Sequence, residues 1–158
     1  MSKGATTQRM RPPGAAVAYA TTHMVRDSCL CLHVQRAARA LSRRFDEAFR
    51  PLALTNQQFS LMMSLNRPAP AGMGALASLL AMDRTTLTAA LKPLERRGLV
   101  EVAVDPADRR GRLLRLTPAG QRLLARALPI WTRVHAELDV HLAGGNASLL
   151  RGHLRALS

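Results

Sequence analysis

Aromatic residues are scarce in this sequence. They make up 3% of it, as Tyr19, Phe45, Phe49, Phe59 and Trp131. Proteins that bind single-stranded nucleic acid or RNA stack bases on exposed aromatic side chains. Five rings spread along 158 residues are too few for such a platform, so the composition disfavours this class of protein.

Acidic residues and lysines are also few. The chain has 10 Asp and Glu against 23 Lys and Arg, a formal net charge of +13, and Lys3 and Lys92 are its only lysines. Such a chain attracts a polyanion, and guanidinium groups bind phosphate oxygens and guanine edges in pairs of hydrogen bonds. An arginine-rich genome would produce the same bias without functional meaning, so the charge indicates a polyanion but no mechanism.

Long apolar runs are absent. No segment approaches the ~20 apolar residues of a membrane-spanning helix, and the run from Ala15 to Ala20 is too short for a secretory signal. We therefore expect a cytoplasmic protein with no membrane partner. In that compartment Cys29 and Cys31 are expected to be free thiols.

Motifs of catalysis and metal binding are missing too. The sequence has no glycine-rich phosphate loop and no nucleophile elbow, and the adjacent carboxylates Asp46 and Glu47 are expected to be solvated. The five histidines lack metal-ligand spacing, apart from the loose pair His135 and His141. We therefore expect that the protein is not an enzyme and that it binds neither a metal nor a cofactor.

The strongest signal lies between Asp83 and Gly120. Here the helix-like stretch DRTTLTAALKPLERRGLV precedes two alternating stretches, EVAV and RLLRL, which DPADRRG joins. This order is typical of a recognition helix and a β-hairpin wing. The polar first turn can reach base edges, and Arg109, Arg110 and Arg112 can reach phosphates or the minor groove. We therefore expect binding of duplex DNA.

Helix signals precede this segment. Apolar periodicity predicts a long helix over about 25–50, which Pro51 ends. Thr55 is the expected N-cap of a second helix over about 56–66, and a third short helix is expected over about 74–81.

The remaining helices follow from caps and stops. Pro93 is expected to bend the recognition helix, and Gly98 to end it. A fifth helix is expected to begin after Thr117, to kink at Pro129 and to end at Gly144 and Gly145, before a last helix over about 147–157. Its ~25 residues span about 37 Å. Such a helix outreaches a compact core of this size, which predicts a two-fold dimer with recognition helices about 34 Å apart.

Three stretches, LALTNQQFSLMMSL, DRTTLTAALKPLERRGLV and DPADRRGRLLRLTPAG, together resemble the MarR family of winged-helix transcriptional regulators. The resemblance covers nearly everything after residue 24. It implies a mainly α fold with a small antiparallel β-wing. It also implies a homodimeric repressor that leaves a palindromic operator when a phenolic or aromatic-acid-like ligand binds, or when a cysteine is oxidised.

The expected domain layout combines this resemblance with the composition. Residues 1–24 contain basic residues and prolines but no acid, and they are expected to be a disordered arm. Residues 25–158 form one MarR-like domain. In it a winged helix-turn-helix at 55–117 lies between dimerisation segments at 25–54 and 118–158.

The resemblance also assigns DNA contacts. It places five residues of the recognition helix toward the major groove and Arg109 or Arg110 at the wing tip, with Asp105 and Asp108 orienting this arginine pair. The alternative is a solvated basic helix face beside an ordinary turn. The expected DNA-contacting residues are Arg84, Thr85, Thr86, Thr88, Lys92, Arg109, Arg110 and Arg112.

The resemblance implies a ligand pocket between the dimerisation helices and the winged domain. His33, Phe59, Met63 and Trp131 are its expected lining residues. Rows of methionine and aromatic residues are more often plain core than pocket wall.

The stretch DSCLCLH is similar to the start of the first helix in the organic-hydroperoxide-sensing branch of the family, with Cys31 as the matching cysteine. Helix phase places Cys31 on the inward row and Cys29 on the wetter side. Phe45 and Asn56 stand where that branch has tyrosines that hydrogen-bond the sulfur, and a phenyl ring cannot donate that bond. Sensing of a small ligand is therefore the leading hypothesis and a Cys31 hydroperoxide sensor the alternative. Two less favoured hypotheses are an architectural DNA-binding protein and a thiol peroxidase.

Overall fold

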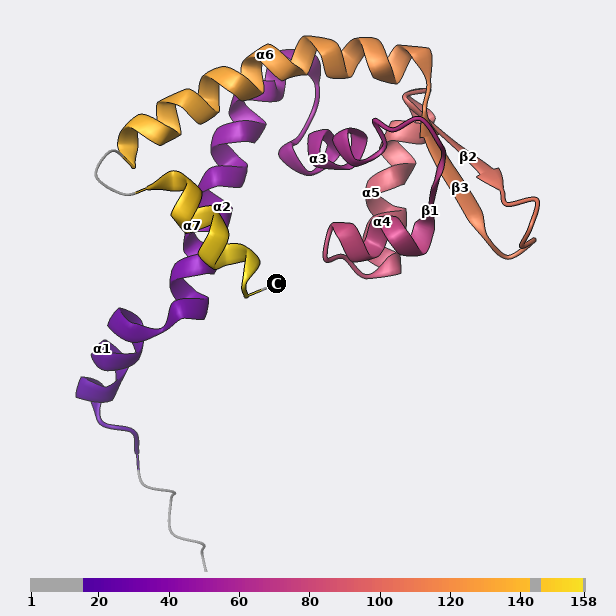
Figure 1. The fold of residues 1–158 in the computed structure, drawn as a ribbon. Coiled ribbons are helices and arrows are strands. Elements are labelled where there is room, and N and C mark those ends of the chain that lie inside the picture. Colours follow the sequence, from indigo (N-terminus) through magenta and orange to yellow (C-terminus); the bar gives the residue numbers. More distant parts are fainter. Residues whose placement is uncertain (1–15, 143–145, 158) are drawn as a thin grey trace, which may run out of the picture. The chain divides into compact units, whose positions relative to one another are not determined.

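The computed structural model describes residues 16–142 and 146–157, which fall into two units divided after Ala38 (Figure 1). In the N-terminal unit, helix α1 (Tyr19–Ser28) precedes the first turns of helix α2 (Leu30–Phe49). The single helix predicted over 25–50 is therefore two helices, because Cys29 between them has extended backbone angles, φ −74° and ψ 102°. Helix α1 begins at Tyr19, within the range 1–24 that is predicted to be a disordered arm. Residues 1–15 lie outside the described part.

The second unit begins in α2, which ends at Phe49 as Pro51 predicts, in a 3-10 turn η1 (Arg50–Leu52). Helix α3 (Asn56–Ser64) follows. The predicted N-cap is confirmed: the Thr55 hydroxyl accepts the Gln58 N–H at 3.2 Å, and the Gln58 side chain accepts the Thr55 N–H at 3.1 Å. This reciprocal pair satisfies two helix N–H groups that have no partner within the helix.

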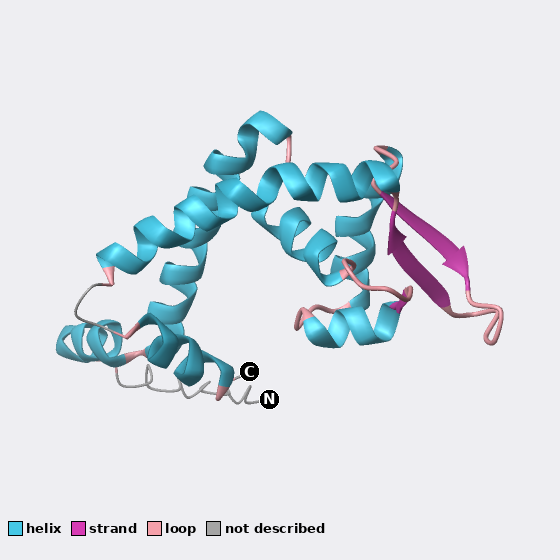
Figure 2. Cartoon of the chain, turned by 45° about the horizontal axis from the view of Figure 1, so that its top comes forward, coloured by secondary structure: helices cyan, strands magenta, loops and turns pink. Residues whose placement is uncertain are grey.

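A helix-turn-helix and a small sheet come next. Helix α4 (Met73–Leu79) precedes helix α5 (Arg84–Arg96), and strands β2 (Val100–Val104) and β3 (Arg112–Leu116) form the predicted hairpin. Figure 2 shows these two strands in magenta. Strand β1 (Ala71–Gly72), which no sequence pattern predicts, pairs with β3, so the antiparallel order is β1-β3-β2. Two residues are too few for a period-two pattern to signal a strand.

One apolar core holds this unit together. It takes side chains from α2, α3, α4, α5, the sheet and α6, and no polar side chain is buried among the described residues. Helix α5 contributes Leu87, Leu91 and Leu94, each at most 3% exposed. The largest fully buried side chains are Phe49, Leu61, Met62, Leu76, Leu87, Leu94 and Leu114.

Two helices complete the chain. Helix α6 (Pro118–His141) begins after the predicted cap Thr117 and continues through Pro129, and it is visibly curved in Figure 1. The predicted stop at Gly144 and Gly145 lies outside the described residues. Helix α7 (Ala147–Arg155) buries none of its residues.

The start of α6 lies close to the backbone of Gly98 and Leu99. The Thr117 N–H donates to the Leu99 carbonyl at 3.1 Å, and the Thr117 hydroxyl donates to the Gly98 carbonyl at 2.6 Å. Gly120, one turn into α6, lies against the same backbone, because a Cβ atom there would be 2.1 Å from the Leu99 carbonyl oxygen. Only glycine allows this approach.

We expect Gly120→Ala to destabilise the fold by about 1–3 kcal/mol or more, because the new methyl group must displace the backbone at Leu99. Gly152→Ala in α7 is the matched control. Its Cβ would meet only Arg155 Nη2 at 3.9 Å, and alanine should add about 0.5–1 kcal/mol of helix stability. Urea denaturation of both variants measures the difference. Equal effects of the two substitutions would contradict the close approach.

Candidate DNA-binding surface

Helix α5 has one buried and one exposed face. Leu87, Leu91 and Leu94 form the buried face. The opposite side exposes a helical stripe made of Thr85, Ala89, Lys92 and Arg96. A shallow groove of about 360 Å³ runs beside Lys92, Pro93 and Arg96. Arg96 is absent from the predicted contacts, although its position four residues after Lys92 places it on the same stripe.

The start of α5 is fixed by Asp83, as predicted. Its carboxylate accepts the Thr86 N–H at 2.8 Å and the Thr86 hydroxyl at 2.6 Å. These bonds, the hydroxyl bond first, lower the pKa of Asp83. The carboxylate therefore remains charged and holds the first turn of the helix.

The threonine hydroxyls of α5 are not equivalent. The Thr86 hydroxyl donates to Asp83, and the Thr88 hydroxyl donates to the Arg84 carbonyl at 2.7 Å. Both hydroxyl protons are therefore already engaged in hydrogen bonds within the chain. The Thr85 hydroxyl has no hydrogen-bond partner among the described residues, so it is the one hydroxyl of the three that is free to donate to a base.

The loop of the wing, residues 105–111, is held by its own carboxylates. Asp105 accepts the Ala107 N–H, and Asp108 accepts the Arg110 N–H, each at 2.9 Å. Gly111 closes the loop with an N–H bond to the Asp108 carbonyl at 2.7 Å. A Cβ at Gly111 would lie 3.0 Å from that carbonyl oxygen and from the Asp105 Cβ, so a larger residue would press on the loop.

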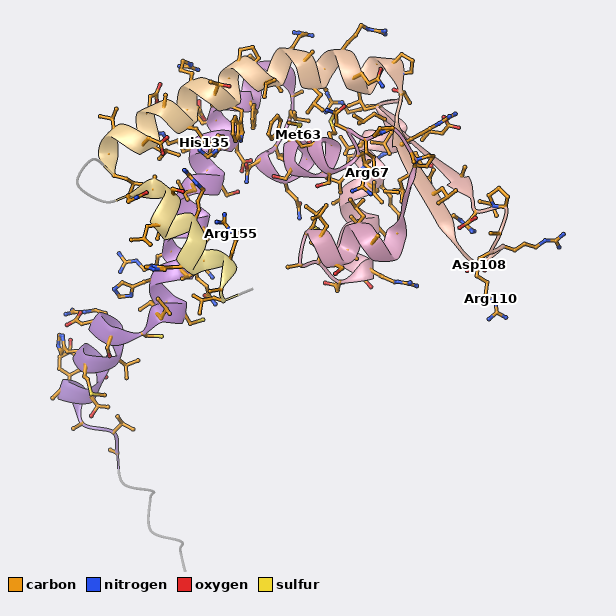
Figure 3. The ribbon with its side chains drawn as sticks, in the orientation of Figure 1. Met63, Arg67, Asp108, Arg110, His135 and Arg155 are labelled. Carbon is orange, nitrogen blue, oxygen red and sulfur yellow. The ribbon has the colours of Figure 1, made fainter. Side chains whose placement is uncertain are left out.

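Asp105 and Asp108, which are expected to orient the wing arginines, act on the backbone of the loop and not on the guanidinium groups. No ion pair between described residues includes Asp105 or Asp108. Aspartates in turns bind backbone N–H groups two residues on, and that local bond is made here instead. Arg109 and Arg110 consequently have no acidic partner in the described chain, and Figure 3 shows Arg110 pointing away from the hairpin tip.

Arg112 has a different position from the other wing arginines. Its Nη1 donates to the carbonyls of Gly111 at 2.8 Å and Arg109 at 3.2 Å. The guanidinium is exposed but folds back on the loop. It therefore shapes the wing tip from which Arg109 and Arg110 project.

The predicted ligand-pocket residues are brought together only in part. Phe59, 3% exposed, stacks on Phe49 with ring centroids 4.8 Å apart, and its ring lies 6.4 Å from that of Trp131. Met63 is 38% exposed on the next turn of α3. His33 belongs to the N-terminal unit, where its Nδ1 lies 3.0 Å from the Cys29 carbonyl oxygen. An open cavity of about 410 Å³ is instead lined by other residues, among them Arg67, Arg115 and Gln121.

His135 extends this aromatic cluster along α6. Its ring centroid lies 4.1 Å from that of Trp131 and 5.1 Å from that of Phe45. Burial against these rings lowers the pKa of His135, an effect that Arg151 reinforces and Asp139 opposes. His135 is absent from the predicted pocket residues, although its position four residues after Trp131 places both on one helix face.

The cysteines differ from the expected arrangement. Cys31 is exposed, not inward, and its Sγ accepts the Gln35 side-chain N–H at 3.3 Å. Cys29 is half-buried, and its Sγ accepts the Leu32 N–H at 3.4 Å at the start of α2. Cys31 lies in the same helix as the buried Phe45, but no core covers the first turns of α2 in the single chain: no described residue before Phe45 is buried, and Leu41 is 42% exposed.

No group of three or more His, Cys, Asp or Glu side chains in the described ranges could hold a metal ion. No helix of that part of the chain is long and apolar enough to cross a membrane.

A helix-turn-helix with an exposed polar second helix, followed by a basic antiparallel hairpin, defines the winged helix-turn-helix class of proteins. The MarR family model matches residues 54–111. The transcriptional regulator HosA of Escherichia coli O111:H- is 33% identical over 104 residues, which cover 66% of this chain and 77% of HosA. The chain belongs to the MarR family of transcriptional regulators, in which homodimers are typical.

Solved structures agree with this family assignment. The Mycobacterium tuberculosis regulator MosR, in complex with DNA, is 37% identical, with a TM-score of 0.74 over 82% of this chain and 93% of MosR. The transcriptional repressor CouR, bound to a 23-mer DNA duplex, is 30% identical, with a TM-score of 0.75 over 84% of this chain and 94% of CouR.

We expect His135 to make stability depend on pH. Its pKa is lower in the folded chain, so below the usual value of 6.5 the unfolded chain binds a proton that the folded chain does not. The free energy of unfolding should therefore fall as the pH drops through that range. His135→Gln should weaken this dependence between about pH 7.5 and 5.5. His153→Gln, on α7, is the control for loss of one imidazole, and thermal melts followed by circular dichroism provide the measurement. An unchanged pH dependence in His135→Gln would contradict the expectation.

Proposed function

We propose that this MarR-family regulator binds duplex DNA sequence-specifically through α5 and the wing. The observation that carries the proposal is that the exposed stripe of α5 and the unpaired arginines of the wing belong to one packed unit. In this proposal Thr85, Lys92 and Arg84 lie in the major groove, and Arg109 and Arg110 reach phosphates or the minor groove. Thr86, Thr88 and Arg112 hold these side chains in place. The DNA complexes of MosR and CouR support this assignment.

We infer that the regulator acts as a homodimer on a palindromic operator. Residues 55–117 would read one half-site, while 25–54 and 118–158 dimerise. Two observations support this division: α1 and α7 bury no residue in the single chain, and Leu149 and Leu154 of α7 are 56% and 42% exposed. Apolar faces of this kind are stable when a second copy covers them.

We further infer that a small phenolic or aromatic acid releases the operator and that binding represses transcription. The half-buried Trp131 and His135 beside the buried ring of Phe59 offer an aromatic contact and one titratable group, and Met63 is exposed on the same helix as Phe59. Aromatic surface with a few polar groups is typical of small-molecule sites. CouR, a repressor, supports the direction of regulation.

Fluorescence anisotropy on duplexes from the upstream region of the protein's own gene, compared with shuffled duplexes, tests the DNA-binding proposal. We expect roughly 10³-fold or greater preference for the native duplex at physiological salt. A ratio near one with a steep salt dependence would support an architectural DNA-binding protein instead.

Substitutions separate the two kinds of contact. We expect Thr85→Ala to lower the preference for the native duplex by about tenfold. Arg110→Ala should weaken binding to both duplexes and reduce the salt slope by about 1. Arg122→Ala removes an exposed arginine of α6, outside the recognition helix and the wing, and controls for charge. If Arg110→Ala behaves like Arg122→Ala, the wing assignment fails.

A hydroperoxide sensor that uses Cys31 is a second candidate, because Cys31 is exposed and its sulfur accepts a hydrogen bond. A hydroperoxide would oxidise the Cys31 thiol to a sulfenic acid and be reduced to the corresponding alcohol. We expect such oxidation to weaken binding to the native duplex in the wild type and in Cys29→Ser, but not in Cys31→Ser. The anisotropy assay before and after hydroperoxide measures this. Loss of the response in Cys29→Ser alone would exclude Cys31 as the sensor.

A further inference from the structure

Arg97, at the C-terminal end of the recognition helix, binds the end of a different helix. Its Nη1 donates to the Ala53 carbonyl at 2.5 Å, and its Nη2 donates to the Leu52 carbonyl at 3.2 Å. These carbonyls lie where α2 and the 3-10 turn η1 end. The last carbonyls of a helix have no partner within it, and the planar guanidinium fork supplies two donors to them at once.

The turn that Arg97 contacts is closely constrained. Ala53 has left-handed backbone angles, φ 49° and ψ 45°, which alanine adopts only when its surroundings impose them. The Ala53 N–H donates to the Arg50 carbonyl at 2.9 Å, and the Asn56 N–H donates to Asp46 of α2 at 2.6 Å. The direction in which the chain leaves α2 is therefore set at this turn.

The backbone on the α5 side of this contact is also held by hydrogen bonds. Gly98, with φ 64°, ends α5, and its N–H donates to the Glu95 carbonyl at 2.8 Å. The next N–H, of Leu99, donates to the Leu94 carbonyl at 2.9 Å. Arg97 thus projects from a rigid helix end. Its two hydrogen bonds join the recognition helix to the end of α2.

We propose that Arg97 is a positioning residue for DNA binding, which sets the angle of α5 relative to α2 and thereby the half-site spacing that the dimer accepts. The inference rests on the proposed function, in which α2 belongs to the dimerisation part and α5 reads DNA. Arg97 itself does not need to touch the operator.

A small change in the direction of α5 at Arg97 causes a larger displacement at the other end of the helix. Thr85 lies twelve residues from Arg97, so the reading end of α5 is about 18 Å from the contact. A rotation of about 5° at Arg97 would move that end by about 1.5 Å, enough to break hydrogen bonds to base edges. Stability depends much less on the contact, because Arg97 is exposed and the leucines of α5 remain buried.

The experiment begins with selection of preferred duplexes by the wild-type protein from a randomised library. Two further duplexes carry one base pair more or one fewer between the half-sites, which moves them by about 3.4 Å and rotates them by about 35°. Anisotropy at one salt concentration gives the three affinities. We expect the wild type to prefer the native spacing by about tenfold or more.

Arg97→Ala should weaken binding to the native spacing and bring the three affinities to within about threefold of one another. Arg97→Lys keeps the charge but loses the planar fork that reaches both carbonyls at once, and should fall between Arg97→Ala and the wild type. Arg122→Ala removes the same charge and should lower all three affinities by one factor. Thermal melts of each variant report folding, and Arg97→Lys provides the test if Arg97→Ala does not fold.

Two results would overturn the inference, and they are distinct. If the wild type selects no duplex, the proposed function fails and the role of Arg97 fails with it. If the wild type selects an operator but Arg97→Ala keeps the full spacing preference, as Arg122→Ala does, only the positioning role fails.

Discussion

The burial of three leucines by α5 is the constraint on which the rest of this structure depends. Leu87, Leu91 and Leu94 follow the helical repeat, so one face of α5 is committed to the core. The opposite face, from Thr85 to Arg96, must then point outward. Cores are close-packed, so α5 cannot rotate about its axis without opening a cavity. The same packing that stabilises the unit therefore selects which side chains are presented to a partner.

Electrostatics on this surface follows from how the acidic residues are used. Some carboxylates pair with arginines, as Glu137 does with Arg44 at 2.8 Å and Glu101 does with Arg115 at 2.9 Å across the wing strands. At the start of α5 and at the wing tip, Asp83, Asp105 and Asp108 bind backbone N–H groups instead. Each of these bonds orders a turn and leaves Arg109 and Arg110 without an acidic partner in the described chain. At these two places the acidic residues thus shape the basic surface without neutralising its guanidinium groups.

Local signals in the sequence predict much of the fold. The caps Thr55, Asp83 and Thr117 and the stop at Gly98 each act within a few residues, so the sequence locates the helix ends they control. The apolar period of α5 likewise predicts its exposed face.

Other features depend on contacts between distant segments and leave little local signal. Gly120 is required by the backbone at Leu99, and Arg97 contacts residues more than forty positions earlier. The break at Cys29 has no local signal either, because no proline or glycine lies between Gly14 and Pro51. Asp108 shows that a local partner can also be misjudged. An acid directly before two arginines suggests an ion pair, but its carboxylate accepts the backbone N–H of Arg110, two residues away, instead.

The terminal helices connect stability to DNA binding. An isolated helix of ten residues, such as α1, is marginal in water, and α7 with nine residues is no better. Both gain stability chiefly when their apolar side chains are covered. If a second copy covers them, association and ordering of these helices are one equilibrium, and it shifts with protein concentration. The spacing between two recognition helices is then defined only in the assembled dimer, and it depends on how rigidly each α5 is joined to the helices that dimerise.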